Sequence, residues 1–289
     1  MKVQTYILNS FGKSVDGGNP AGVVLEADNL SEKEMKKIAS IIGLSETAFV
    51  MKSKMADFKV RFFTPVEEVD ICGHATIATF SLLANKGIIE SGEYTQETKA
   101  GILKVNVNED LSIMMNQNKP IYGEVLDSEL IAETLNISTE SFMENLPIQI
   151  VSTGLKDIII PVKSIEILNN IKPNFDAISK VSEKYNVVGY HIFTLETIEN
   201  SMAQCRNLAP LYGIDEESAT GTSNGALACY LFKYGKVSSC KQINITMEQG
   251  YSMNKPSKIN VELKVKNNEV IDIKVGGSAF NLKEMEFEI

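Results

Sequence analysis

The chain has 289 residues, of which 44% are hydrophobic and 22% charged, the profile of a globular protein with room for one large domain or two of ordinary size. Its formal net charge of −9 argues against nucleic-acid binding, which needs a cationic face, but it leaves room for a local site that holds a small anion. No apolar run approaches the length of a membrane span, and the start, "MKVQTYILNSFGKSV", lacks the apolar core of a signal peptide, so we expect a cytoplasmic protein without a membrane partner.

The first part of the chain alternates in a way that predicts several strands and one sharply delimited helix. The strands are expected at residues 2–10, 22–27, 47–52 and 57–64. The helix lies in "LSEKEMKKIASIIGL". Ser31 can cap this helix, Glu34 completes a capping box, and Gly43 suits its C-terminal end.

Strands also dominate the rest of the chain. They are expected in "EYTQET", "ILKVNVN" and "LSIMMNQ", at residues 148–152, 157–162, 187–196 and 201–208, and in about the last fifty residues. Helices are expected near residues 127–136, 174–185 and 221–235. Because helices seldom alternate with the strands, the pattern favours an α+β fold over a doubly wound parallel sheet.

Two segments resemble each other and indicate an internal repeat. "CGHATIATFSLLANKG" (72–87) and "TGTSNGALACYLFKYG" (220–235) both have glycine as their second and last residue. Each is typical of a turn of small residues that opens a buried helix. Coincidence between two buried helices is the alternative, because glycine and alanine are common in such helices. A true repeat predicts two similar halves joined near residue 118, where "NQNKPIYGEV" can form a polar connection.

Helix openings of this kind can bind an anion. The N-terminus of a helix carries unsatisfied N–H groups and a partial positive charge, and small residues let a ligand approach that backbone closely. If the two openings converge, they can hold a carboxylate and stabilise an enolate formed beside it. That chemistry still requires a base.

Five blocks of the sequence resemble the signatures of the phenazine-biosynthesis PhzF-like family. They are "GNPAGVV", "GLSETAFV", "RFFTPVEEVDICGHATIAT", "SATGTSNGALACYL" and "EQGYSMNKPS", in the order of the family and across nearly the whole chain. The resemblance implies an α+β fold shared with diaminopimelate epimerase and proline racemase. Two similar domains, each a curved sheet around a central helix, would then have the active site between them. We expect these domains at residues 1–118 and 119–289, with central helices at about 73–86 and 221–234 and with about the last ten residues able to return to the first half.

The resemblance also implies the site residues. Glu46 of "LSETAF" corresponds to the catalytic carboxylate, and His74 to an active-site histidine. At a helix N-terminus the positive field disfavours the charged imidazolium, so we expect His74 to stay neutral and to donate one hydrogen bond to the substrate. From the residues alone, a solvated carboxylate at a strand start is the better interpretation of Glu46, and a structural helix cap is the alternative for His74. The full predicted set comprises Glu46, His74 and Glu217 as catalytic residues and Asn19, Cys72, Gly73, Gly221 and Thr222 as substrate-binding residues.

Three positions qualify the resemblance. In related epimerases a cysteine opens each central helix, and the two thiols invert a stereocentre. Here Cys72 stands at the first position and Thr220 at the second, so a two-thiol racemase is not expected. Glu217 and Ser218 replace the family's Asp-Pro, which argues that the substrate differs from the phenazine precursor.

The function expected from the sequence is a cofactor-independent isomerase that moves a proton on a small carboxylate-bearing metabolite with one glutamate. Two alternatives remain open: an epimerase or racemase with a second acid, and a catalytically inactive metabolite-binding protein. The four cysteines contain no CxxC pair, and with two histidines in the chain we expect no structural metal site. No nucleotide-binding motif is present either. A homodimer is expected from the family.

Overall fold

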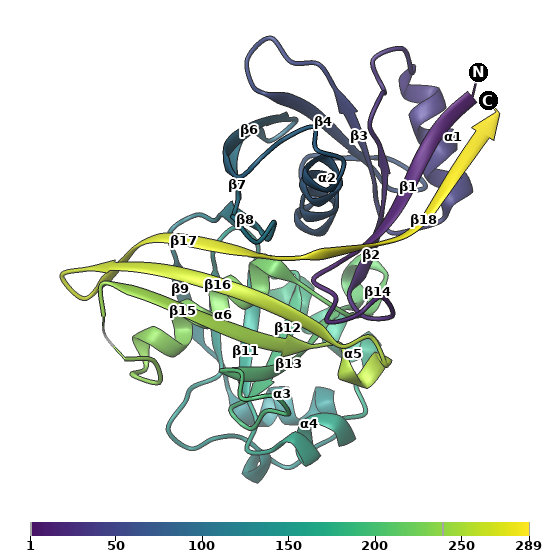
Figure 1. Cartoon of the computed structure of the whole chain (residues 1–289). Helices are drawn as coiled ribbons and strands as arrows, with labels where there is room; N and C mark the ends of the chain where they lie inside the picture. The colour runs from purple at the N-terminus through teal and green to yellow at the C-terminus, as the bar shows by residue number, and fades with distance from the viewer. Residues whose placement is uncertain (1, 239, 289) are drawn as a thin grey trace. The chain divides into compact units, whose positions relative to one another are not determined.

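The computed structural model describes residues 2–238 and 240–288, which form two compact units (Figure 1). The first unit contains residues 1–116 and 276–289, and the second contains residues 117–275. The last strand, as far as Glu288, is therefore part of the first unit, whereas Ile289 lies outside the described residues. Within the described residues no helix is both long and apolar enough to cross a membrane.

The first unit is built on one mixed sheet. In spatial order its main strands are β18 (Ala279–Glu288), β1 (Lys2–Ser10), β2 (Asn19–Val24), β3 (Thr47–Met51), β4 (Phe58–Phe63), β6 (Gly92–Thr98), β7 (Gly101–Val107) and β8 (Ile113–Asn116). The β2–β3 and β4–β6 pairs are parallel and the other pairs are antiparallel. The short strand β5 (Glu68–Val69) pairs with β4.

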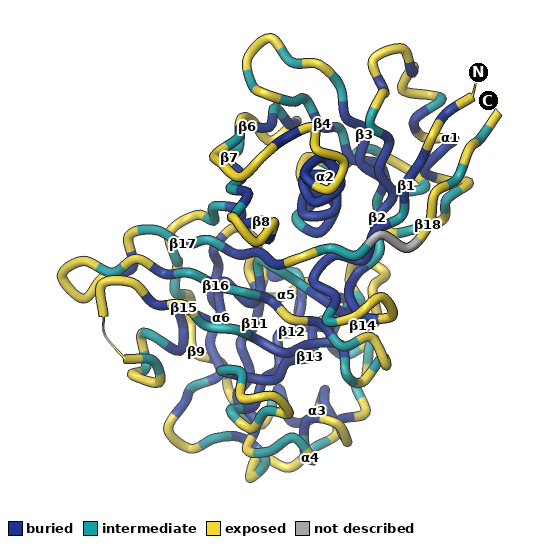
Figure 2. Tube along the Cα trace, viewed as in Figure 1, coloured by how far each residue is buried: buried dark blue, intermediate teal, exposed yellow. Residues whose placement is uncertain are grey.

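Helix α2 (Gly73–Asn85) forms the core of this unit, and helix α1 (Glu32–Ile42) packs on the other face of the sheet. Strand β3 shows the alternation: Ala48 and Val50 pack with α2, whereas Phe49 packs with α1. Every residue of α2 from His74 to Ala84 is buried, as the dark blue helix in Figure 2 shows. A helix that is buried on all sides must be surrounded by the rest of its unit, which makes α2 the central helix.

Helix α1 confirms the end signals expected from its sequence. The Ser31 hydroxyl accepts the backbone N–H of Glu34, and the Glu34 carboxylate accepts the backbone N–H of Ser31. Gly43 follows the helix with a φ of 68°, a left-handed conformation that glycine adopts at little cost.

The second unit has its own mixed sheet. Its strands run in the order β9 (Ile121–Val125), β10 (Gln149–Ser152), β11 (Lys156–Pro161), β12 (Gly189–Thr194), β13 (Ala203–Ala209), β15 (Gln242–Gln249) and β16 (Ser257–Lys266). Strand β14 (Ile214–Glu217) pairs with β13, and β17 (Glu269–Gly277) follows β16 in the chain. The helices of this unit are α3 (Ser128–Leu135), α4 (Ile165–Asn170), α5 (Phe175–Tyr185) and α6 (Gly221–Lys233), with 3-10 turns at Thr139–Ser141, Pro210–Tyr212 and Tyr251–Met253.

The alternation of β11 and β12 positions the helices of this unit on opposite faces. Ile158 and Tyr190 pack in one apolar cluster with side chains of α3 and α5. On the other face Phe193 packs edge-on against Tyr230 of α6, with their ring centroids 5.8 Å apart. The residues of α6 from Ser223 to Leu231 are all buried, which again makes it the central helix of its unit.

Two elements correct the interpretation of the sequence. The segment expected to be a polar connection contains β9, which pairs with β10. Its side chains are mostly exposed, with Ile121 and Val125 more than half exposed, so its pattern carries no signal of one buried face. Helix α4 was also not predicted, because its six residues contribute only Leu168 to the buried set.

Candidate functional site

The N-terminus of α2 is open and contains no side-chain cap. Cys72 precedes the helix in an extended conformation (φ −142°, ψ 117°), and its side chain makes no capping hydrogen bond. Gly73 is the first helical residue, and a Cβ atom added there would meet no atom within 4 Å. The first backbone N–H groups of α2 therefore border free space, where the helix dipole favours an anion.

His74 is fixed from several sides. It is the second residue of α2 and is buried, and its carbonyl oxygen accepts the hydroxyl proton of Ser10 on β1 at 2.6 Å. Its Nδ1 lies 3.4 Å from the Sγ atom of Cys72, and its Nε2 lies 3.4 Å from the hydroxyl of Ser45. With this backbone bond and two side-chain neighbours, the imidazole is held in one orientation.

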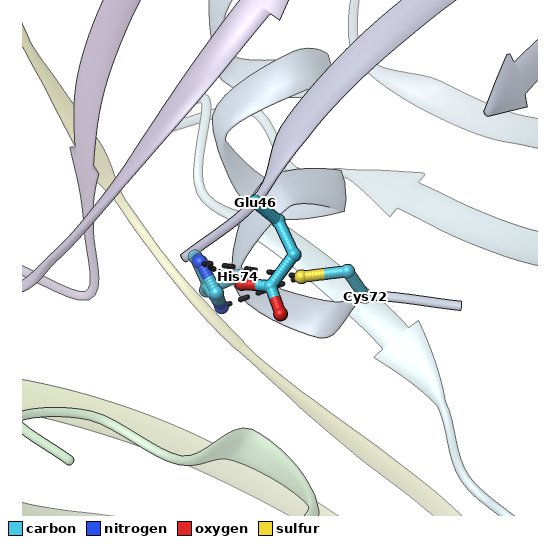
Figure 3. Close-up of side chains that lie close together, drawn as sticks. All are labelled: Glu46, Cys72 and His74. Atoms are coloured by element: carbon cyan, nitrogen blue, oxygen red, sulfur yellow. Dashed lines mark hydrogen bonds and ion pairs between the residues drawn. The ribbon is translucent and has the colours of Figure 1, made fainter. Parts of the chain in front are cut away.

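Glu46 reaches the same place from the residue that precedes β3 (Figure 3). Its backbone carbonyl accepts the N–H of Gly22 at 3.1 Å, which fixes the backbone at this point. Its Oε2 atom lies 3.3 Å from Nε2 of His74, and the Glu46 side chain is 19% exposed. That oxygen is itself buried and accepts no hydrogen bond. The carboxylate oxygen that faces His74 is therefore not tied up by a hydrogen bond from the protein.

The protonation state of His74 follows from its burial. Burial lowers the pKa of His74, and the nearby Glu46 carboxylate raises it in partial opposition. The net direction is downward, so the ring is neutral near pH 7. The sequence predicted a neutral ring because of the helix N-terminus, whereas burial is the larger cause in the structure. One ring nitrogen of neutral His74 remains available as a hydrogen-bond donor.

Other predicted residues lie at the opening of α6 in the second unit. Gly221 and Thr222 are its first two residues, and Thr220 precedes it as Cys72 precedes α2. Glu217 ends β14, and its carboxylate accepts the hydroxyl proton of Thr220 at 2.6 Å. The carbonyl of Thr222 accepts a hydrogen bond from the hydroxyl of Thr153 at 3.1 Å. The predicted carboxylate and the helix opening are thus joined within this unit.

Asn19, the remaining predicted residue, begins β2 in the first unit. It is buried and pairs in register with Ser10, whose hydroxyl holds the carbonyl of His74. The structure therefore groups Glu46, Cys72 and His74 by direct contact and connects Asn19 to them through one strand pair.

Sequence reasoning missed the polar residues that support these positions. Ser45, whose hydroxyl lies 3.4 Å from His74 Nε2, directly precedes Glu46 in "LSETAF", and this adjacency could have indicated that it lies near the site. In the second unit the Gln249 side chain accepts the N–H of Thr220 at 3.2 Å and donates to the carbonyl of Glu217 at 2.7 Å. Asn224 on α6 donates to Gln249 at 2.7 Å. Gln249 stands in "EQGYSMNKPS", but nothing in that block indicates its partners.

Comparisons with known proteins show the family of the chain. The family model of phenazine biosynthesis-like proteins matches residues 8–284. An uncharacterized isomerase of Clostridium acetobutylicum is 39% identical over 288 residues, covering 96% of this chain and 95% of its own. The crystal structure of a PhzF-family phenazine biosynthesis protein of Bacillus anthracis superposes with a TM-score of 0.92 at 32% identity and covers all of both chains.

A more distant relative has a named reaction. The trans-2,3-dihydro-3-hydroxyanthranilate isomerase of Pseudomonas chlororaphis is 26% identical over 279 residues, or 94% of each chain. The predicted α+β fold and the predicted enzyme class are both confirmed by these relatives. The chain is an isomerase that belongs to the phenazine biosynthesis-like protein family.

Proposed function

We propose that Glu46 moves a proton between two carbons of a small carboxylate-bearing metabolite and that the reaction needs no cofactor. The observation that carries the proposal is the buried Oε2 atom of Glu46, which accepts no hydrogen bond and lies 3.3 Å from His74 Nε2. A carboxylate in this state can remove a proton and return it as the conjugate acid, so one residue serves both steps.

The substrate class follows from the helix opening and from one relative. Gly73 leaves free space beside the first N–H groups of α2, which suits a carboxylate or an enolate oxygen. The Pseudomonas relative is named for an anthranilate-type acid, which carries such a group. At 26% identity this supports a small cyclic or unsaturated acid as the substrate class, and Glu217–Ser218 in place of Asp-Pro argues for a different member of it.

His74 takes a supporting role in this proposal. Neutral His74 would donate one hydrogen bond to the substrate as charge develops on it. The roles expected for Gly221, Thr222 and Glu217 in the second unit stay predictions. Asn19 and Cys72 would line the substrate-binding region.

The thiol pair of related epimerases does not fit this chain. The residue before α6 is Thr220, and its hydroxyl is engaged as a donor to Glu217 at 2.6 Å. A threonine hydroxyl has no accessible anion near neutral pH, so it cannot act as the second base of a two-thiol mechanism. This observation favours proton transfer by one carboxylate. The homodimer and the cytoplasmic location suggested by the sequence stay predictions.

The test is exchange of carbon-bound hydrogen in deuterated water. The protein is mixed with a panel that includes trans-2,3-dihydro-3-hydroxyanthranilate and related acids, and deuterium incorporation and isomer formation are followed by NMR. Glu46→Gln keeps the shape of the side chain but cannot take a proton. We expect it to lower the rate by about a thousandfold, within the usual contribution of a general base. The exposed Glu67→Gln is the matched control. Equal rates for Glu46→Gln and wild type would remove Glu46 from the mechanism.

A further inference from the structure

Three different metal-ligating side chains meet in the first unit. One ligand atom each of Glu46, Cys72 and His74 lies within 4.8 Å of the others. Figure 3 shows the three side chains pointing toward one another. His74 Nε2 is 3.3 Å from Glu46 Oε2 and 4.0 Å from Cys72 Sγ. Tetrahedral zinc, with bonds of about 2.0 Å to nitrogen or oxygen and about 2.3 Å to sulfur, needs separations of about 3.3 Å and about 3.5 Å between such atoms.

We propose that this cluster binds one zinc ion through Glu46 Oε2, Cys72 Sγ and His74 Nε2. The nitrogen–oxygen separation already suits the ion, whereas the sulfur lies about 0.5 Å too far from the nitrogen. All three ligand atoms lie within 4.8 Å of one another, so the side chains would have to draw together around the ion. The buried Glu46 oxygen accepts no hydrogen bond, so a cation would satisfy an atom that the protein leaves unsatisfied. Three protein ligands leave the fourth position for water or a substrate oxygen.

The donor set decides which metal is bound. A thiolate sulfur favours zinc, cadmium or cobalt over magnesium and calcium, which prefer oxygen ligands. Binding converts the Cys72 thiol to a zinc thiolate, so the S–H bond breaks, an S–Zn bond forms, and one proton passes to solvent with no change in oxidation state. The sequence predicts no metal site, because the chain has few histidines and no CxxC pair. The present cluster needs only one histidine and one cysteine, since it has three ligands, two of them separated by one residue.

The consequence for activity rests on the proposed function. A zinc ion on Glu46 would occupy the oxygen that takes the substrate proton, and it would also hold the His74 nitrogen. We therefore expect zinc to inhibit the isomerase and a chelator to restore it. Magnesium, which has little affinity for sulfur, serves as the control ion.

Binding is measured directly on the whole protein, by competition with a chromogenic zinc chelator. We expect one zinc per chain, with affinity lowered about a hundredfold or more by Cys72→Ser, because loss of even a residue that orients a ligand costs 10- to 100-fold. Cys240→Ser removes the exposed cysteine and is the matched control, with affinity expected to stay within about twofold of wild type. Cobalt gives a second readout, since a thiolate–cobalt charge-transfer band should appear with wild type and Cys240→Ser but not with Cys72→Ser. Circular dichroism checks that each variant is folded, and His74→Asn replaces Cys72→Ser if the latter is not.

The outcomes separate this proposal from the proposed function. No 1:1 zinc binding, or equal weakening by Cys72→Ser and Cys240→Ser, overturns the metal site whatever the activity shows. Zinc binding that depends on Cys72 and inhibits turnover supports both. Zinc binding that depends on Cys72 but leaves turnover unchanged keeps the metal site and rejects Glu46 as the base.

Discussion

Replacing Asp157 with Asn should alter how the stability of the protein depends on pH. Asp157 is 2% exposed on β11, and its Oδ2 atom accepts the hydroxyl proton of Ser223 at 2.6 Å. Burial raises the pKa of this carboxyl to about 6 from its ordinary 3.8. Because the folded protein binds this proton at a higher pH than the unfolded chain, Asp157 adds stability as the pH falls through this window. About two pH units correspond to ~3 kcal/mol of unfolding free energy.

His191 on β12 acts in the opposite direction. It is fully buried, its Nδ1 lies 3.2 Å from the amide nitrogen of Asn207, and burial lowers its pKa to about 4 from its ordinary 6.5. The unfolded chain therefore takes up this proton first, and stability falls by ~3 kcal/mol as the pH drops through that range. In the wild type the two effects largely cancel between pH 6 and pH 4.

The assay is urea unfolding followed by circular dichroism at a series of pH values. Between about pH 7 and pH 4, the unfolding free energy of wild type minus that of Asp157→Asn should rise by ~3 kcal/mol in favour of wild type. For His191→Gln, the unfolding free energy of wild type minus that of the variant should instead fall as the pH drops, because the variant has no buried histidine that resists protonation. A wild-type minus Asp157→Asn difference that stays constant across this range would refute the reasoning.

Three further predictions concern an ion pair, the helix opening and the site histidine. Glu216→Ala should lower the unfolding free energy by about 3 kcal/mol in urea unfolding. The reason is that the buried Arg206, whose side chain is 8% exposed, loses the carboxylate that it contacts at 2.8 and 2.9 Å. Glu144→Ala, which breaks the exposed pair with Lys163, is the control and should cost under about 0.5 kcal/mol. Gly73→Ala should leave the urea unfolding midpoint unchanged but lower kcat/KM about tenfold or more. The new methyl group enters only the free space at the opening of α2, where we expect the substrate to bind. A fall in the unfolding midpoint would instead show that this space is not free. The pH profile of kcat/KM should show no loss near the ordinary histidine pKa of 6.5, because burial lowers the pKa of His74; an inflection there that disappears in His74→Asn would contradict this.

Local signals predicted much of the fold. The ends of α1 followed from the Ser31 and Glu34 capping box and from Gly43, and the structure contains each of these contacts. The buried helices α2 and α6 followed from their glycine-led, apolar sequences. Strand β9 could not be predicted because its pairing with β10 is a contact between backbones, and its exposed side chains do not alternate.

The site was less accessible to local reasoning. Glu46 and His74 were named only through the family resemblance, since no spacing rule brings residues 28 positions apart together. The structure adds the reason: β3 starts beside the opening of α2, so the two side chains meet. The polar cluster of Asp157, His191 and Ser223 was not predicted at all, because its members come from two strands and a helix far apart in the sequence.

The central claim is that one carboxylate, Glu46, carries the proton from one substrate carbon to another. Its most direct test is a single-turnover reaction in ordinary water with substrate deuterated at the carbon that loses its hydrogen. We predict that part of the deuterium appears at the new position in the product with wild type, and that Glu46→Gln forms almost none of this product in the time of one wild-type turnover. Deuterium transfer at an undiminished rate in Glu46→Gln would contradict the account.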